Sequence, residues 1–218
     1  MSPSLPNILL TGFDPFGGES INPSWEAVRA LHGRRIGGHR VVARLLPTEF
    51  AASLRLLKAA VRETAPAILL GVGQAGGRER LSIERVAVNL QDARIPDNAG
   101  ARPIDQPVIP GGPAAYFSNL PVKAMLAALR DRGVPAELSH TAGTYVCNHV
   151  AYAMLHLAAK RRGARAGFIH IPYLPAQAAR LHGKPSMALE EMVRGLEIAL
   201  RVAATTRSDL TVSGGTID

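Results

Sequence analysis

The chain of 218 residues contains one cysteine, so it cannot form an intrachain disulfide. It has no apolar stretch close to the roughly 20 residues that a helix needs to span a bilayer. Residues 1–7 also lack the basic start of a secretory signal. These absences predict a cytoplasmic protein that does not enter the membrane.

Aromatic residues are scarce, at 5% of the chain, which leaves few rings on which nucleic-acid bases would stack. The net charge of +8 would favour a phosphate backbone if the basic residues were clustered. Only two short basic runs occur, at 34–35 and 160–162, and the second lies where a helix is expected to end and cations suit the helix dipole. We therefore expect no nucleic-acid partner.

Motifs for metals and nucleotides are also missing. Cys147 and His149 alone are too sparse for a metal site. Residues 71–76 give a partial G-x-G-x-x-G pattern, but no helix pattern follows it. We expect neither a metal nor a dinucleotide.

Short apolar runs alternate with helical patterns in the first third of the chain. The runs at 7–11, 39–46 and 67–71 have the composition of strands, with helices predicted between them at 23–31 and 48–63. This alternation indicates an α/β fold in which helices cover both faces of a sheet with parallel strands. Further strands are predicted at 81–90, 136–139 and 167–171, and further helices at 121–132, 147–162 and 186–204.

The predicted elements fit one domain spanning residues 1–204. Ser186 is a candidate cap for the last helix. Residues 91–120 are rich in proline and are expected to be irregular, with a hairpin near 102–109. The tail at 205–218 is polar and is expected to be mobile.

The single cysteine, Cys147, lies where a glycine-containing turn meets the predicted 147–162 helix. The unpaired N–H groups and the dipole at a helix start stabilise a thiolate and lower the pKa of a cysteine, which favours nucleophilic attack. The alternative is an inert thiol that packs as a small hydrophobe.

A base for this thiol is available at a neighbouring strand end. Ligands of open α/β sheets bind beyond the carboxyl ends of the strands, where Cys147 and His170 would meet. His170 is the preferred base and His140, in the turn before Cys147, is the alternative.

Glu84 lies on the more apolar face of the predicted 81–90 strand, where a carboxylate needs a partner. It would orient the histidine, as the third member of a nucleophile, base and orienter arrangement. The alternative is a structural ion pair with Arg78 or Arg85.

Five blocks of the sequence resemble, in order, those of the type I pyroglutamyl peptidases, also called pyrrolidone-carboxylate peptidases. The resemblance covers about residues 8–204 and implies a cytoplasmic cysteine peptidase that removes N-terminal pyroglutamyl residues from peptides. It also implies a three-layer α/β/α sandwich with a mixed, largely parallel central sheet, a homotetramer, and no metal or organic cofactor. The blocks are residues 11–18 with 22–24, then 76–89, 92–98, 139–148 and 170–173.

The resemblance matches Cys147, His170 and Glu84 to a catalytic triad, which favours His170 over His140. A phosphorylase or glycosyl transferase is disfavoured because a phosphate site is missing, and an inactive binding protein is disfavoured because the triad is intact. Positions that match or adjoin the substrate pocket are Phe13, Phe16, Thr48, Gln74, Arg94, Tyr145 and Val146.

Overall fold

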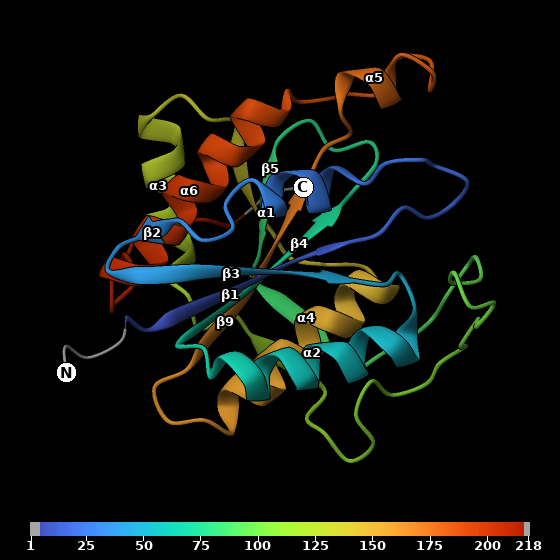
Figure 1. Cartoon of the computed structure of the whole chain (residues 1–218), viewed down its shortest axis with the longest axis horizontal. Helices are drawn as coiled ribbons and strands as arrows, with labels where there is room; N and C mark the ends of the chain where they lie inside the picture. Colours follow the sequence, from blue (N-terminus) through green and yellow to red (C-terminus); the bar gives the residue numbers. More distant parts are fainter. Residues whose placement is uncertain (1–4, 216–218) are drawn as a thin grey trace.

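Continuous runs of Ile, Leu and Val form the middle of the sheet. β1 (Asn7–Phe13) and β4 (Ile68–Gln74) are buried along most of their length, as strands covered on both faces must be. The computed structural model, which describes residues 5–215, places them in a seven-stranded sheet of order β2-β3-β1-β4-β9-β5-β8 (Figure 1). The other strands of this sheet are β2 (Arg35–Ile36), β3 (His39–Leu46), β5 (Leu81–Glu84), β8 (Ala136–Ser139) and β9 (Arg165–Ile171).

The sheet is mixed and largely parallel. β3, β1, β4 and β9 run parallel to one another, and β5 runs parallel to β8. β5 is antiparallel to β9, and β2 is antiparallel to β3. The carboxyl ends of β4 and β9 therefore lie side by side at one edge of the sheet.

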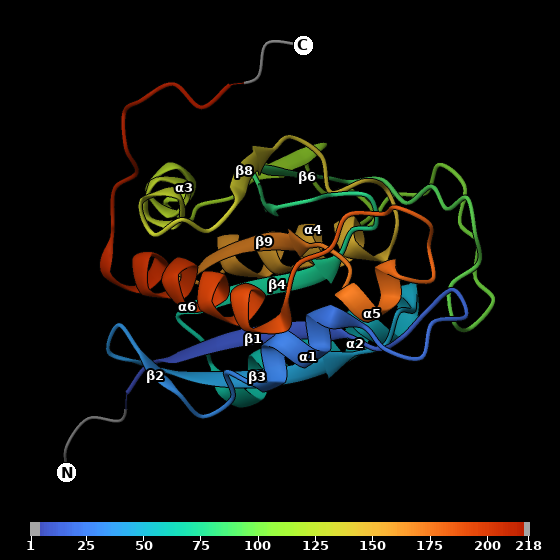
Figure 2. The same ribbon diagram turned by 90° about the horizontal axis from the view of Figure 1, so that it is seen from above.

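Helices cover both faces of the sheet (Figures 1 and 2). One face packs against α1 (Pro23–Arg29), α3 (Val122–Asp131) and α6 (Leu189–Thr205). The other packs against α2 (Phe50–Thr64) and α4 (Val146–Ala159). The short α5 (Pro175–Ala178) follows β9. The predicted three-layer α/β/α sandwich is confirmed.

The prediction of a single strand at 81–90 is wrong, because the chain leaves the main sheet at Arg85. Its second half is β6 (Val86–Val88), which pairs with β7 (Ala115–Phe117) in a separate two-stranded sheet. The predicted hairpin near 102–109 is also wrong, since the only pairing there is an isolated bridge between Gln91 and Gln106 in the described part of the chain.

Several element ends differ from the prediction. The strands predicted at 7–11 and 67–71 extend to Phe13 and Gln74. The first two glycines of the G-x-G-x-x-G pattern at 71–76 therefore lie within β4. Ser186 does not cap the last helix, because α6 begins only at Leu189 and its N-cap residue makes no side-chain capping bond.

The segment after α6 contacts the start of α3. The carboxylate of Asp209 accepts hydrogen bonds from the backbone N–H groups of Lys123 and Ala124, at 2.9 to 3.1 Å. Residues 216–218 of the predicted mobile tail, and residues 1–4 of the chain start, lie outside the described residues.

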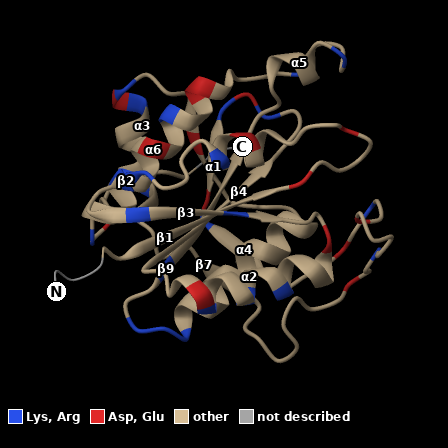
Figure 3. Ribbon diagram, viewed as in Figure 1, with Lys and Arg blue, Asp and Glu red and all other residues tan. Residues whose placement is uncertain are grey.

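Charge is distributed over many elements. Lys and Arg occur on strands, helices and loops and are not gathered on one element (Figure 3). Within residues 5–215, none of the helices has the length and apolar character that crossing a membrane requires.

Candidate active site

Cys147 is the second residue of α4, and its sulfur lies over β4. A Cβ atom placed on Gly73 would lie 2.8 Å from Cys147 Sγ, so the glycine leaves the space that the sulfur occupies. Gly73 is paired in register with His170 on β9. Cys147 Sγ therefore lies beside the β4 position that is in register with the preferred histidine, near the carboxyl ends of β4 and β9.

His170 and Glu84 are in direct contact. His170 Nδ1 lies 2.7 Å from Glu84 Oε1, and both side chains are buried. His140, the alternative base, is exposed on the turn before Cys147. The structure thus pairs the preferred base with the candidate orienter, while Cys147 Sγ lies beside Gly73, the register partner of His170.

Arg78 shares the same carboxylate oxygen. Its Nη1 donates to Glu84 Oε1 at 2.7 Å, and its Nη2 donates to the carbonyl of Thr141 at 3.0 Å. Of the two ion-pair partners considered for Glu84, Arg78 is the one in contact. Glu84 therefore binds the histidine and an arginine at once.

Burial raises the pKa of the Cys147 thiol to about 12; the charge of Glu84 adds to this shift and Arg78 opposes it. This differs from the lowered pKa expected at a helix start. The reason is that the thiol packs against the apolar cluster between α4 and the sheet, where a charged group loses solvation. The resting thiol is neutral and needs a base to become a thiolate. The cysteine remains half-buried rather than sealed off.

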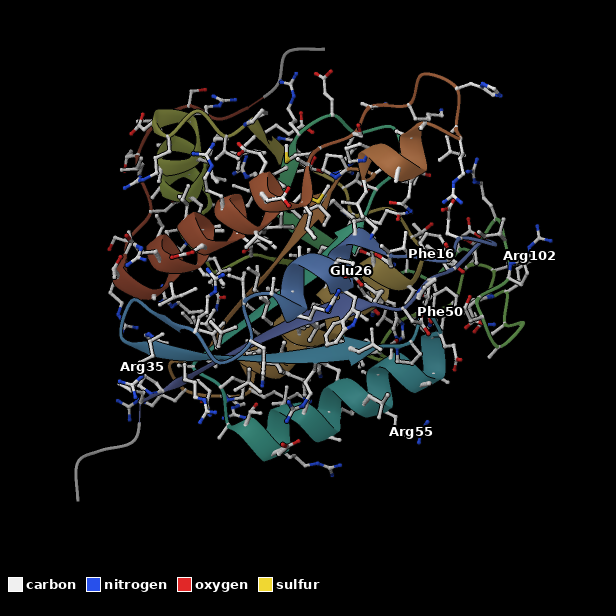
Figure 4. All side chains as sticks on the ribbon, turned by 45° about the horizontal axis from the view of Figure 1, so that its top comes forward. Phe16, Glu26, Arg35, Phe50, Arg55 and Arg102 are labelled. Atoms are coloured by element: carbon white, nitrogen blue, oxygen red, sulfur yellow. The ribbon has the colours of Figure 1, made fainter. Side chains whose placement is uncertain are left out.

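Tyr145, the N-cap residue of α4, packs against two aromatic rings. Its ring centroid lies 6.3 Å from that of Phe16 and 5.5 Å, edge-on, from that of Phe50. Its hydroxyl donates to the carbonyl of Pro96 at 3.0 Å. Figure 4 shows Phe16 and Phe50 on the same side of the molecule.

The other residues matched to the pocket have different environments. Phe13 is buried and packs against Phe168, with ring centroids 6.4 Å apart, and Val146 is also buried. Thr48 binds the loop after β1, donating its N–H to the carboxylate of Asp14 at 2.6 Å and its hydroxyl to that residue's carbonyl at 3.1 Å.

Gln74, at the end of β4, accepts a hydrogen bond from the Gln177 amide at 3.1 Å. Arg94 is exposed and lines a hollow of about 350 Å³ next to the turn before Cys147. The hollow is lined by Asp92, Arg94, Ile95, Gly143, Thr144 and Tyr145.

Sequence reasoning missed the roles of Phe50 and Asn148. Phe50 begins α2, and its ring contacts both Tyr145 and His149. Asn148 is fully buried and exchanges hydrogen bonds with the backbone of Val88. For Asn148, the available signal was an amide directly after the cysteine in the first turn of the predicted helix. The described residues contain no group of three or more His, Cys, Asp and Glu side chains arranged to hold a metal.

Comparison with known proteins identifies the same family that the sequence blocks resemble. The sequence model of a family described as pyroglutamyl peptidase matches residues 6–206. A pyrrolidone-carboxylate peptidase from Erwinia tasmaniensis is 56% identical over 208 residues, which cover 95% of this chain and 97% of that protein.

Solved structures agree with this match. The pyroglutamyl peptidase I of Bacillus amyloliquefaciens superposes with a TM-score of 0.92 at 44% identity, covering 96% of this chain and 100% of that one. A mutant pyrrolidone carboxyl peptidase from the hyperthermophile Pyrococcus furiosus gives a TM-score of 0.88 at 44% identity, covering 90% and 97%.

Proposed function

The chain belongs to the pyroglutamyl peptidase family of cysteine peptidases, which remove N-terminal pyroglutamate, and we propose that it uses Cys147, His170 and Glu84 to do so. The observation that carries the proposal is the 2.7 Å contact between His170 Nδ1 and Glu84 Oε1, with Cys147 Sγ next to Gly73, the register partner of His170. Cys147 is the nucleophile, His170 the base, and Glu84 the residue that orients His170.

The acylation half of the reaction starts from a neutral thiol. With Nδ1 held by Glu84, the other ring nitrogen of His170 takes the thiol proton as Cys147 Sγ attacks the pyroglutamyl carbonyl carbon. The tetrahedral intermediate collapses as the carbon–nitrogen bond breaks, and His170 returns the proton to the departing amine. A thioester with Cys147 remains.

Water completes the cycle. His170 takes a proton from the water that attacks the thioester carbonyl, and the carbon–sulfur bond breaks to release pyroglutamic acid and the thiol. In both halves, negative charge develops on the carbonyl oxygen. The backbone N–H groups at the start of α4, including that of Cys147, are proposed as its donors, and the loss of one such donor typically costs about 3 to 4 kcal/mol.

The substrate's lactam is neutral and has no free amine, so its pocket needs apolar walls and a few hydrogen-bond partners. We assign the walls to Phe13, Phe16, Tyr145 and Val146. Thr48 and Gln74 lie around the ring, with backbone groups near Gln74 or Tyr145 meeting its N–H and C=O, and Arg94 lies near the oxyanion.

A fluorogenic pyroglutamyl amide tests the proposal directly. Under reducing conditions the unmodified protein is expected to release the fluorophore, whereas Cys147→Ala is not. The matching prolyl amide, which lacks the lactam carbonyl, serves as the control substrate and is expected to stay intact. No release by the unmodified protein would refute the activity, and equal release by Cys147→Ala would refute the nucleophile.

The resemblance also leads us to propose a cytoplasmic homotetramer. Light scattering coupled to size-exclusion chromatography tests the assembly. A mass near that of one 23.1 kDa chain would contradict the tetramer.

A further inference from the structure

Arg78 connects two parts of the site that the sequence separates. It lies in the loop between β4 and β5, yet its guanidinium binds both Glu84 and the carbonyl of Thr141. Thr141 belongs to the turn that leads into Cys147. One side chain thus links the proposed orienter to the segment that presents the proposed nucleophile.

The carboxylate of Glu84 depends on few partners. Its side chain is 2% exposed, and Oε2 has no hydrogen-bond partner within residues 5–215. Oε1 therefore makes both recorded contacts, one to His170 and one to Arg78. A buried carboxylate needs hydrogen-bond donors and a compensating charge, and the Arg78 guanidinium supplies both.

The same guanidinium acts on the cysteine through space. The charge of Glu84 raises the pKa of Cys147 and the charge of Arg78 lowers it. Glu84 without Arg78 would hold the histidine but would also repel a thiolate. The positive charge of Arg78 offsets part of the effect of the Glu84 carboxylate on the pKa of the nucleophile.

We propose that Arg78 is a positioning residue for the hydrolysis, holding the Glu84 carboxylate against His170 and fixing the turn at Thr141 that presents Cys147. The inference rests on the proposed function of these three residues. It assigns Arg78 no contact with the substrate, so its removal is expected to change the chemical step more than substrate binding.

Three variants test the role of Arg78. Arg78→Gln removes the charge, Arg78→Lys keeps it on a chain that cannot donate in the same forked geometry, and Arg80→Gln is the matched control. Arg80 lies two residues away and pairs with Glu79 and Glu137 at the surface. With the pyroglutamyl amide, Arg78→Gln is expected to lower kcat by about 10- to 100-fold with KM within about twofold, because an interaction that serves the chemical step is lost.

Arg78→Lys is expected to recover most of that loss in kcat, and Arg80→Gln to match the unmodified protein. A second readout does not depend on turnover. Because the chain has one cysteine, its rate of alkylation by iodoacetamide reports only on Cys147, and this rate is expected to fall in Arg78→Gln and recover in Arg78→Lys.

The possible outcomes separate the two proposals. Unchanged kcat and alkylation rate in Arg78→Gln would overturn the inference and leave the proposed function standing. Equal losses of kcat in both Arg78 variants, accompanied by a lower melting temperature, would also overturn it. A change in KM with kcat unchanged would overturn it as well. An unmodified protein that cleaves no pyroglutamyl amide would contradict the proposed function, while the alkylation rates would still test the link from Arg78 to Cys147.

Discussion

His170 Nδ1 and Glu84 Oε1 lie 2.7 Å apart across the antiparallel pairing of β9 and β5 in the main sheet. Glu84 is directly opposite Phe168. Phe168 and His170 are two residues apart on β9, so their side chains lie on the same face of the sheet. The carboxylate and the imidazole are therefore diagonal neighbours on the face that α4 covers. The antiparallel pairing of β5 is what gives the histidine its partner.

This contact predicts unequal effects for the two residues. His170→Ala is expected to lower kcat for the pyroglutamyl amide by about 10²- to 10⁴-fold, the usual contribution of a positioned base. Glu84→Gln is expected to leave measurable activity, because an orienter contributes less than the base that it holds. Steady-state kinetics on the two variants, with circular dichroism to verify folding, checks the order. Comparable losses at both positions would contradict it.

Gly73→Ala is expected to impair the cysteine directly. The added Cβ would lie 2.8 Å from Cys147 Sγ and 3.0 Å from the ring of Phe168, so the sulfur or the ring must move. We expect a lower kcat, slower alkylation of Cys147, and a loss of about 1 to 3 kcal/mol in the free energy of unfolding from overpacking.

Gly71→Ala is the matched control for this change. On the same strand, its Cβ would crowd Phe168 at 2.4 Å and the Met154 sulfur at 3.3 Å, without Cys147 among its nearest atoms. It is expected to destabilise the protein while slowing alkylation less than Gly73→Ala does. Equal alkylation rates in the two variants would show that the ring, and not the thiol, is displaced.

The buried His149 is expected to make the protein less stable in mild acid. Burial lowers its pKa to about 4, the Phe50 backbone opposes that shift, and the charge of Lys58 adds to it. The unfolded chain binds the proton near pH ~6.5, so stability is complete above that pH and declines as the pH falls toward the folded pKa. From pH ~7.5 to ~5.5 the free energy of unfolding is expected to fall by about 1.3 kcal/mol through this residue.

Urea denaturation at the two pH values measures the effect of His149. His149→Gln is expected to remove that part of the pH dependence, whereas His182→Asn, at an exposed histidine with positive φ, is expected to retain it. An unchanged pH dependence in His149→Gln would assign the acid sensitivity to other groups.

The order of the first strands and helices could be predicted because β1 and β4 contain continuous apolar runs. The break at Arg85 could not be predicted in this way, since residues rich in Val, Ile and Leu continue on both sides of it with no glycine or proline between them. Arg85 donates its N–H to Ser139 in the main sheet and accepts from Ser118, which follows β7. Partners distant in sequence set that break, so the local pattern carries no sign of it.

The candidate site was predictable in its members but not in its electrostatics. A histidine in an apolar strand and a glutamate on an apolar face both require partners, and they are partners of each other. The sequence left an orienting role and an ion pair for Glu84 as alternatives, whereas both contacts occur at one oxygen. The raised pKa of Cys147 depends on packing under α4, which a local rule about helix starts does not include.

Asn148 predicts a structural dependence of the active-site helix. Its Oδ1 accepts from the N–H of Val88 at 3.0 Å, and its Nδ2 donates to the carbonyls of Val88 and Leu90, both at 2.9 Å. These bonds tie the first turn of α4 to β6. Asn148→Ala would leave buried backbone groups without partners, at about 1 to 3 kcal/mol for each group that water cannot reach.

Asn148→Asp separates the shape of this residue from its hydrogen bonds. A carboxylate keeps the acceptor for Val88 but turns a donor into an acceptor facing two carbonyls, so it is expected to destabilise the protein as well. Gln91→Ala, which removes an exposed contact to Pro107, is the control and is expected to change the free energy of unfolding by less than about 0.5 kcal/mol. Urea denaturation gives the three values. A midpoint for Asn148→Asp equal to that of the unmodified protein would mean that the two donated bonds do not hold α4 in place, because the aspartate cannot make them.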